Sequence, residues 1–173
     1  MYLIYRSMNY FKTFEQFNES SETYPLRKSN FSMIFKTEFG DVYTVKLVPK
    51  NIVVEGSNIY YLELYFFING SSSQVSNKGN MSKVLNTIGK AILKCIKLNK
   101  EYYTSIIFIN GVRKDTSDTG EVSKRTKTYM RYFPKFLPGY EMSNVNDKLV
   151  FYWPSIKSDA FKLLGKEAEV DYI

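Results

Sequence analysis

The sequence predicts an α+β domain with a mixed, mostly antiparallel sheet and two principal helices on its faces. In the N-terminal half, segments rich in branched and aromatic residues alternate apolar and polar side chains, which is typical of half-buried strands. Two later segments place apolar residues at helical spacing, and each is followed by another strand-like run. Strands that come first and then alternate with helices favour a mixed sheet covered by helices.

The strand pattern begins with a β-hairpin over residues 31–48, which turns at Phe39-Gly40-Asp41 and ends at Pro49. The remaining strands are predicted by alternating apolar and polar residues or by runs of branched and aromatic ones. They are expected over residues 52–54, 59–68, 104–109, 140–142 and 149–153.

The clearest helix is expected over residues 81–97, with one apolar face and four lysines outside it. A second helix is expected over 121–136, stopped by Pro138-Gly139, and a short terminal helix over 158–166. Residues 8–19 predict an amphipathic helix with an aromatic stripe. These patterns divide the chain into an N-terminal helix and linker, residues 1–30, and one domain, residues 31–173.

Composition excludes several kinds of chemistry. The chain of 173 residues contains no histidine and a single cysteine, Cys95. Histidine-based catalytic triads, zinc sites built on cysteine pairs and an internal disulfide are therefore excluded, and no metal is expected. Cys95 lies on the apolar face of the predicted helix 81–97, so it is expected to be a buried thiol.

The net charge of +7 favours anionic partners, among them nucleic acid. Basic residues gather on the second predicted helix beside aromatic residues that can stack on bases. A solvated helix face has the same pattern, so both interpretations stay open. The expected anion-binding residues are Lys124, Arg125, Lys127 and Arg131.

Glu63 is the most unusual carboxylate, because a glutamate at the centre of a strand faces either solvent or a functional site. Alternation places it on the same face as Tyr61 and Tyr65. The loop Ser76–Asn80 follows this strand and opens the first long helix, where a glycine lets backbone N–H groups approach a phosphate. An ordinary loop with Ser82 or Asn80 as the helix cap has the same pattern, so both interpretations stay open.

Residues 12–20, KTFEQFNES, resemble the capsid-targeting peptides of T4-like tailed phages. The resemblance implies a phage-encoded protein of the bacterial host cytoplasm that is packaged into the virion. The aromatic anchors that would dock it to a protein partner are Phe11, Phe14 and Phe17. No segment approaches the roughly 20 apolar residues of a membrane helix, so no membrane association is expected.

Over residues 31–153, the order of strands and helices resembles the GNAT acyltransferase fold. The resemblance implies that the loop opening the central helix holds the pyrophosphate of acetyl-CoA. The residues at that place are Lys78, Gly79, Asn80 and Met81. It further implies that Glu63 deprotonates the acceptor amine through water and that Tyr129 protonates the departing thiolate.

Three interpretations follow. The first is a phage accessory or virion-associated binding protein that has no catalytic activity, needs no cofactor and docks through its N-terminal helix. The second is an acyl-CoA-dependent N-acyltransferase of the GNAT type, with acetyl-CoA as its cosubstrate. The third is a basic nucleic-acid-binding protein.

Overall fold

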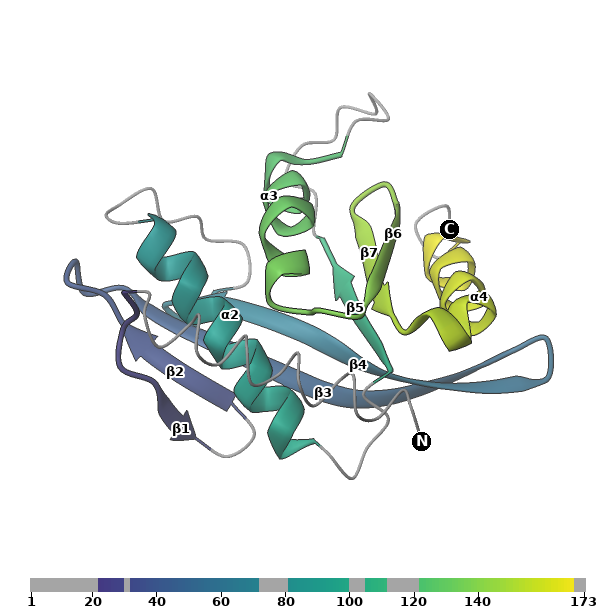
Figure 1. The fold of residues 1–173 in the computed structure, drawn as a ribbon, viewed down its shortest axis with the longest axis horizontal. Coiled ribbons are helices and arrows are strands. Elements are labelled where there is room, and N and C mark those ends of the chain that lie inside the picture. Colours follow the sequence, from purple (N-terminus) through teal and green to yellow (C-terminus); the bar gives the residue numbers. More distant parts are fainter. Residues whose placement is uncertain (1–21, 30–31, 72–80, 100–104, 112–121, 170–173) are drawn as a thin grey trace.

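Seven strands form one mixed sheet in the computed structural model, which describes residues 22–29, 32–71, 81–99, 105–111 and 122–169 (Figure 1). The strand order is β1-β2-β3-β4-β5-β7-β6, and every neighbouring pair is antiparallel except β4 and β5. The predicted α+β class and mostly antiparallel sheet are therefore confirmed. The strands are β1 (Arg27–Ser29), β2 (Ser32–Lys36), β3 (Val42–Val54), β4 (Ser57–Ile68), β5 (Ile106–Asn110), β6 (Glu141–Val145) and β7 (Lys148–Tyr152).

The described chain has three α-helices where two principal ones were expected. They are α2 (Met81–Leu98), α3 (Lys124–Tyr132) and α4 (Lys157–Glu169), of 18, 9 and 13 residues. The predicted terminal helix is thus longer than α3, which gives way to the 3₁₀ turn η1 (Phe133–Lys135) at Pro134. A second 3₁₀ turn, η2 (Pro154–Ile156), leads into α4. No helix in the described ranges is long and apolar enough to cross a membrane.

The helices cover opposite faces of the sheet because alternate residues of the central strands point to opposite sides. Ile107 and Phe151 belong to the larger core, which α2 and η1 cover. Their neighbours Ile106 and Tyr152 belong to a second core, which α4 closes with Ala160, Leu163 and Leu164. β5 and β7 are consequently buried on both faces, which explains the continuous apolar run at residues 106–109.

Strand β3 does not end at Pro49, as the sequence predicted, but continues to Val54. β2 pairs with β3 only as far as Lys46, so no described strand lies on that side of Pro49. A proline costs no ladder hydrogen bond at such an edge position. The hairpin then turns at Glu55 and Gly56, whose φ angles of 50° and 78° suit a two-residue turn of the primed type.

The segment predicted as a linker contributes to the sheet and to its core. Residues 27–29 pair with β2 as an edge strand. Tyr24 is buried, stacks on Phe35 with ring centroids 5.7 Å apart, and donates its backbone N–H to Thr87 Oγ1 on α2 at 2.9 Å. The segment joins the domain because Tyr24 extends the apolar surface of the hairpin. The predicted helix 8–19 lies outside the described residues.

Helix α2 confirms the predicted apolar face, since Val84, Ile88, Ala91, Ile92 and Cys95 are all buried. Burial raises the pKa of the Cys95 thiol to about 11, as expected for an unreactive core thiol. Gly89 lies on the same buried side, directly against the ring of Phe136, and a Cβ atom there would overlap that ring. The glycine therefore sets how closely α2 approaches the end of η1.

We expect Gly89→Ala to lower the free energy of unfolding by about 1–3 kcal/mol, because the added methyl overpacks the core against Phe136. Gly165→Ala is the matched control, since Gly165 is exposed in α4 and a Cβ there meets no atom within 4 Å. It should raise stability by about 0.5–1 kcal/mol through helix propensity. Urea unfolding of both variants checks the pair, and equal effects would contradict the packing argument.

Candidate functional site

Strands β4 and β5 run parallel but pair at only two positions, Leu62 with Ile107 and Glu63 with Phe108. Beyond these pairs the strands diverge, and a cavity of about 230 Å³ lies between them, which we call the fork. Residues from both strands and from α3 line it. They are Glu63, Leu64, Tyr65, Phe66, Phe67, Ile109, Asn110, Gly111, Arg125 and Tyr129.

An aromatic cluster lies beside the divergence. The ring of Phe66 on β4 lies 5.4 Å from Tyr129 and 5.7 Å from Phe133, and Phe133 in turn lies 6.4 Å from Phe151 on β7. These rings pack together on the α3 face of the sheet, beside the point where the two strands part.

A small polar cluster fixes the start of α3 against the end of β5. The Asp147 side chain accepts a hydrogen bond from the Ser123 N–H at 2.8 Å, and its carbonyl accepts one from the Gly111 N–H at 2.9 Å. Ser123 caps the helix by accepting from the Thr126 N–H at 3.2 Å. A Cβ at Gly111 would overlap the Asp147 carbonyl, so only glycine permits this approach. The cluster thereby positions Arg125 and Tyr129 beside the fork.

Tyr129 is the predicted general acid, and the structure brings it to the fork. Its ring stacks on Phe133 with centroids 4.8 Å apart. Burial raises the pKa of its phenol to about 12, although the positive charge of Arg125 opposes this shift. The hydroxyl is therefore protonated at neutral pH and available as a donor.

Glu63, the predicted base, lines the fork where the strands part and is only 7% exposed, although strand alternation places it on the face of the sheet opposite α2. Its carboxylate forms an ion pair with the Lys50 ammonium on β3. Lys50 also donates to the Tyr65 hydroxyl at 2.8 Å. Hydrogen bonds to Glu63 and Tyr65 raise the pKa of Lys50, so the ammonium stays charged.

The predicted basic residues of α3 do not act as one group. With about 100° of rotation per residue, Lys124, Lys127 and Arg131 share the exposed side of the helix, whereas Arg125 is turned toward the fork. Of the predicted phosphate loop, Lys78, Gly79 and Asn80 lie outside the described residues, as do Phe11, Phe14 and Phe17. Met81 is the first residue of α2 and is exposed.

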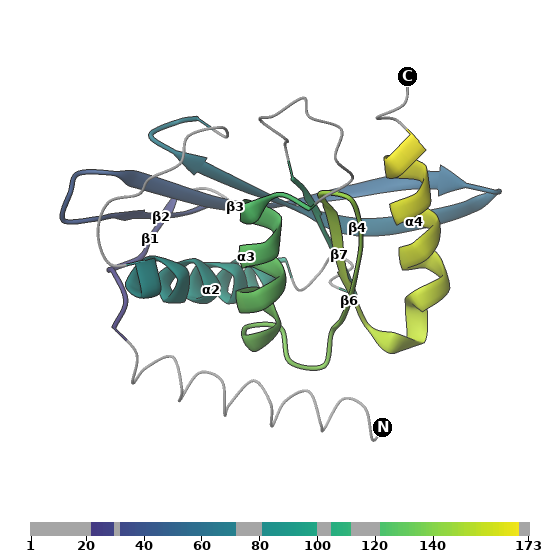
Figure 2. The same ribbon diagram turned by 90° about the horizontal axis from the view of Figure 1, so that it is seen from above.

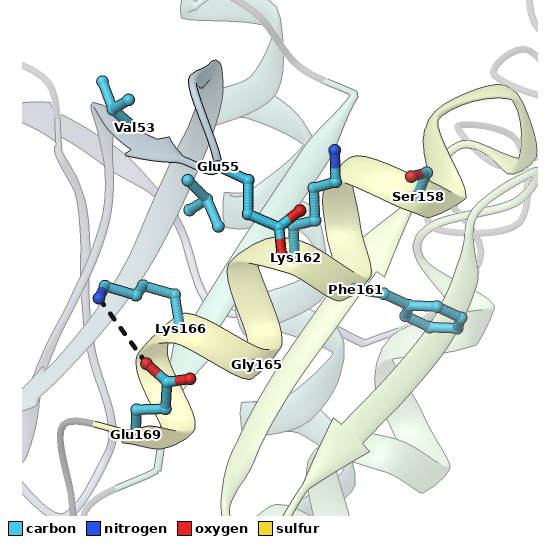
Figure 3. A pocket seen from close by; sticks show the side chains of 9 residues that line it. Val53, Glu55, Ser158, Phe161, Lys162, Gly165, Lys166 and Glu169 are labelled. Atoms are coloured by element: carbon cyan, nitrogen blue, oxygen red, sulfur yellow. Dashed lines mark ion pairs between the residues drawn. The ribbon is translucent and has the colours of Figure 1, made fainter.

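A larger groove of about 600 Å³ lies between the tip of the β3–β4 hairpin and α4 (Figure 3). Val53 and Glu55 line one side, and Phe161, Lys162 and Lys166 the other. The ion pair between Lys166 and Glu169, at 3.7 Å, runs along the helix surface (Figure 3). Its lining residues are exposed, except for Val54 and Lys162, which are half-buried. The groove is therefore an open surface, and we assign the candidate site to the fork.

Within the described residues, no group of three or more histidine, cysteine, aspartate or glutamate side chains lies close enough to hold a metal ion. Comparisons with protein-family models, curated proteins and solved structures found no match for this chain. The function must therefore be argued from the fork itself. Sequence reasoning identified Glu63, Arg125 and Tyr129 but missed Lys50, Phe66 and Gly111, because their roles depend on strand register and on the position of α3.

The raised pKa of Tyr129 predicts a loss of stability in alkali. An unfolded tyrosine titrates near pH 10, so the neutral phenol stabilises the fold below pH 10, and this contribution is lost as pH rises through about 12. Between pH 10 and 12, we expect the free energy of unfolding to fall less steeply for Tyr129→Phe than for the wild type. The two slopes should differ by up to about 1.4 kcal/mol per pH unit. Urea unfolding across this range measures the slope.

The Lys50–Glu63 pair predicts an asymmetric cost of mutation. Lys50→Met leaves a buried carboxylate without its cation and should lower the free energy of unfolding by about 1–3 kcal/mol. Glu63→Gln should cost less, because the Lys50 side chain is 40% exposed and can turn into water. Urea unfolding of both variants and of the double variant gives the coupling energy. Equal single costs with no coupling would contradict this account.

Proposed function

We propose that this protein binds an acyl-CoA in the fork and transfers the acyl group to an amine. The observation that carries the proposal is the fork itself, with Tyr129 on its α3 side and Glu63 at the point where the strands part. The two side chains come from different elements and approach the cavity from different directions. An acyl-transfer site needs this arrangement, because its acid and its base act on different atoms of the reacting pair.

The sheet order supports the resemblance to the GNAT acyltransferases. Four antiparallel strands are followed by a helix, a parallel fifth strand, a second helix and a final antiparallel pair. Because β5 is parallel to β4, helix α2 must return across the sheet between them. Its N-terminus therefore lies at the end of the sheet toward which β4 runs (Figure 1).

The fork suits the linear arm of CoA because the backbone of β4 is unpaired on its β5 side there. From Leu64 to Phe67, no described strand lies beside the β5 side of β4. An extended chain that carries amide groups can add to such an edge in the manner of a strand. The Arg125 guanidinium, which lines the same cavity, supplies positive charge for an anionic cosubstrate. Residues 78–81 remain the expected contacts of the pyrophosphate.

The chemistry follows from the two side chains. The amine nitrogen attacks the thioester carbonyl, so a C–N bond forms and the C–S bond breaks. Glu63 takes the amine proton through water, and Tyr129 donates a proton to the departing sulfur. In the net reaction, one proton moves from the amine to the CoA thiol. Because Lys50 holds the Glu63 carboxylate, this step requires Lys50 to turn outward, which its exposure permits.

The accessory-protein interpretation depends on residues 8–19, outside the described part of the chain, and stays a prediction. The same holds for phage origin and for packaging into a virion. Docking through residues 8–19 is compatible with acyl transfer, whereas the absence of catalysis in that interpretation is not.

Acetyl-CoA at 1 mM should raise the unfolding midpoint by about 5–10 °C if its dissociation constant is about 10 µM. Asn110→Trp should abolish this shift, because Asn110 is exposed at the end of β5 and a large ring there enters the fork. Lys162→Ala, in the other groove, is the control and should keep it. Differential scanning fluorimetry measures all three. No shift for the wild type, or an unchanged shift in Asn110→Trp, contradicts the proposal.

Catalysis is separated from binding by two further variants. Tyr129→Phe and Glu63→Gln should keep the acetyl-CoA shift but lower turnover of an amine acceptor about 100-fold or more. Release of free thiol from acetyl-CoA in the presence of a panel of amines measures turnover. Wild-type turnover in both variants would leave acyl-CoA binding intact and remove the assigned acid and base.

A further inference from the structure

One face of strands β1–β4 carries a described helix at one end alone. Met33, Phe35, Val45 and Leu47 face α2, so the residues that alternate with them face the other way. On that side α4 covers only the part of the sheet near Ile52, Ile59 and Tyr61, and Figure 2 shows α2 and α3 together on the opposite side. We call the uncovered surface the open face; its residues are Arg27, Ser32, Ile34, Lys36, Val42, Thr44, Lys46, Val48, Lys50, Glu63, Tyr65 and Phe67.

The open face is positively charged. It carries four cations and one carboxylate, Glu63, which is already paired with Lys50. Within the described chain, Arg27, Lys36 and Lys46 form no ion pair. Two acidic residues lie in the β2–β3 turn, but neither is available to these cations. Asp41 is buried and accepts from Asn69, and Glu38 is bonded to the Tyr24 hydroxyl, which belongs to the α2 side.

Two aromatic rings lie beside these cations. Tyr65 and Phe67 are half-buried, and their rings are parallel within 6° with centroids 6.3 Å apart. Their Cα atoms are two residues apart on one strand, a spacing of about 6.6–6.8 Å. Lys46 is the cross-strand partner of Tyr65, so a cation lies directly beside one ring. Thr44 is the cross-strand partner of Phe67 and is too small to screen the other ring.

From this surface we infer that the open face binds single-stranded nucleic acid. Bases stack on Tyr65 and Phe67, while Arg27, Lys36 and Lys46 contact the phosphates. Sheets that bind single strands combine these two features, since aromatic rings accept any base and cations follow the backbone. A duplex fits less well, because its bases are already stacked and the open face presents no helix to a groove.

This site differs from the basic side of α3 that the sequence suggested. It also goes beyond acyl transfer and does not depend on it. Tyr65 and Phe67 line both the open face and the fork, whereas Arg27, Lys36 and Lys46 line the open face alone. The cationic residues are therefore the substitutions that separate the two functions.

The experiment is fluorescence anisotropy of a labelled 12-nucleotide oligo(dT) with the full chain, at several salt concentrations. Lys36→Ala with Lys46→Ala should weaken binding and reduce the slope of log K against log salt by about 0.7 for each phosphate that is no longer neutralised. Phe67→Leu should weaken binding about tenfold. The matched control, Lys124→Ala with Lys127→Ala and Arg131→Ala, removes three cations from α3 and should bind nearly as the wild type does.

Each outcome decides the proposal. Loss of binding in the sheet variants, with an unchanged acetyl-CoA shift in the Lys36 and Lys46 variant, supports the open face independently of acyl transfer. Loss in the α3 variant alone overturns it. The proposal is also overturned if polyphosphate displaces the oligonucleotide as well as unlabelled oligo(dT) does and Phe67→Leu binds as the wild type does. That result means charge attraction without stacking. Circular dichroism of each variant excludes unfolding as the cause.

Discussion

Two residue pairs, Leu62 with Ile107 and Glu63 with Phe108, join the two halves of the sheet. β1–β4 form one antiparallel unit, and β5–β7 form another. Backbone pairing between them is brief, so their relative position is held mainly by side chains, by the core under α2 and η1 on one face and by the core under α4 on the other. The cavity, the catalytic candidates and the open face all depend on where this pairing stops.

Where the pairing stops, side chains hold α3 against the sheet. Phe66, Tyr129 and Phe133 pack into one aromatic cluster on the α3 side. Burial of these large rings stabilises the position of α3. The polar cluster around Asp147 then keeps α3 in place, so the ring of Tyr129 stays in contact with the aromatic cluster.

Much of this fold could be predicted from hydrophobic periodicity, because α2 and the hairpins have one clearly apolar face each. Tyr24 and β1 could not, since an edge strand of three residues has no readable period. The Lys50–Glu63 pair was predictable in principle. A two-residue turn at Glu55-Gly56 fixes the register by counting, which sets Val48 opposite Glu63 and puts Lys50 on the same face two residues further along. The fork could not be predicted, because the residue pattern of a strand does not show which strand will pair with it or over how many residues.

The position of Glu63 explains how a charged residue is tolerated inside a strand. It is the last residue of β4 that pairs with β5, so its backbone is held while its side chain reaches the edge of a cavity. One residue earlier, Leu62 is fully buried in the main core; one residue later, Leu64 is buried there as well. The backbone of Glu63 is therefore held by strand pairing, while its side chain borders the cavity. Lys50 from the neighbouring strand neutralises its carboxylate. Replacing a buried ion pair with apolar residues often stabilises a protein, so the pair is weak evidence for a purely structural role. Among the described residues that line the fork, Glu63 is the one carboxylate.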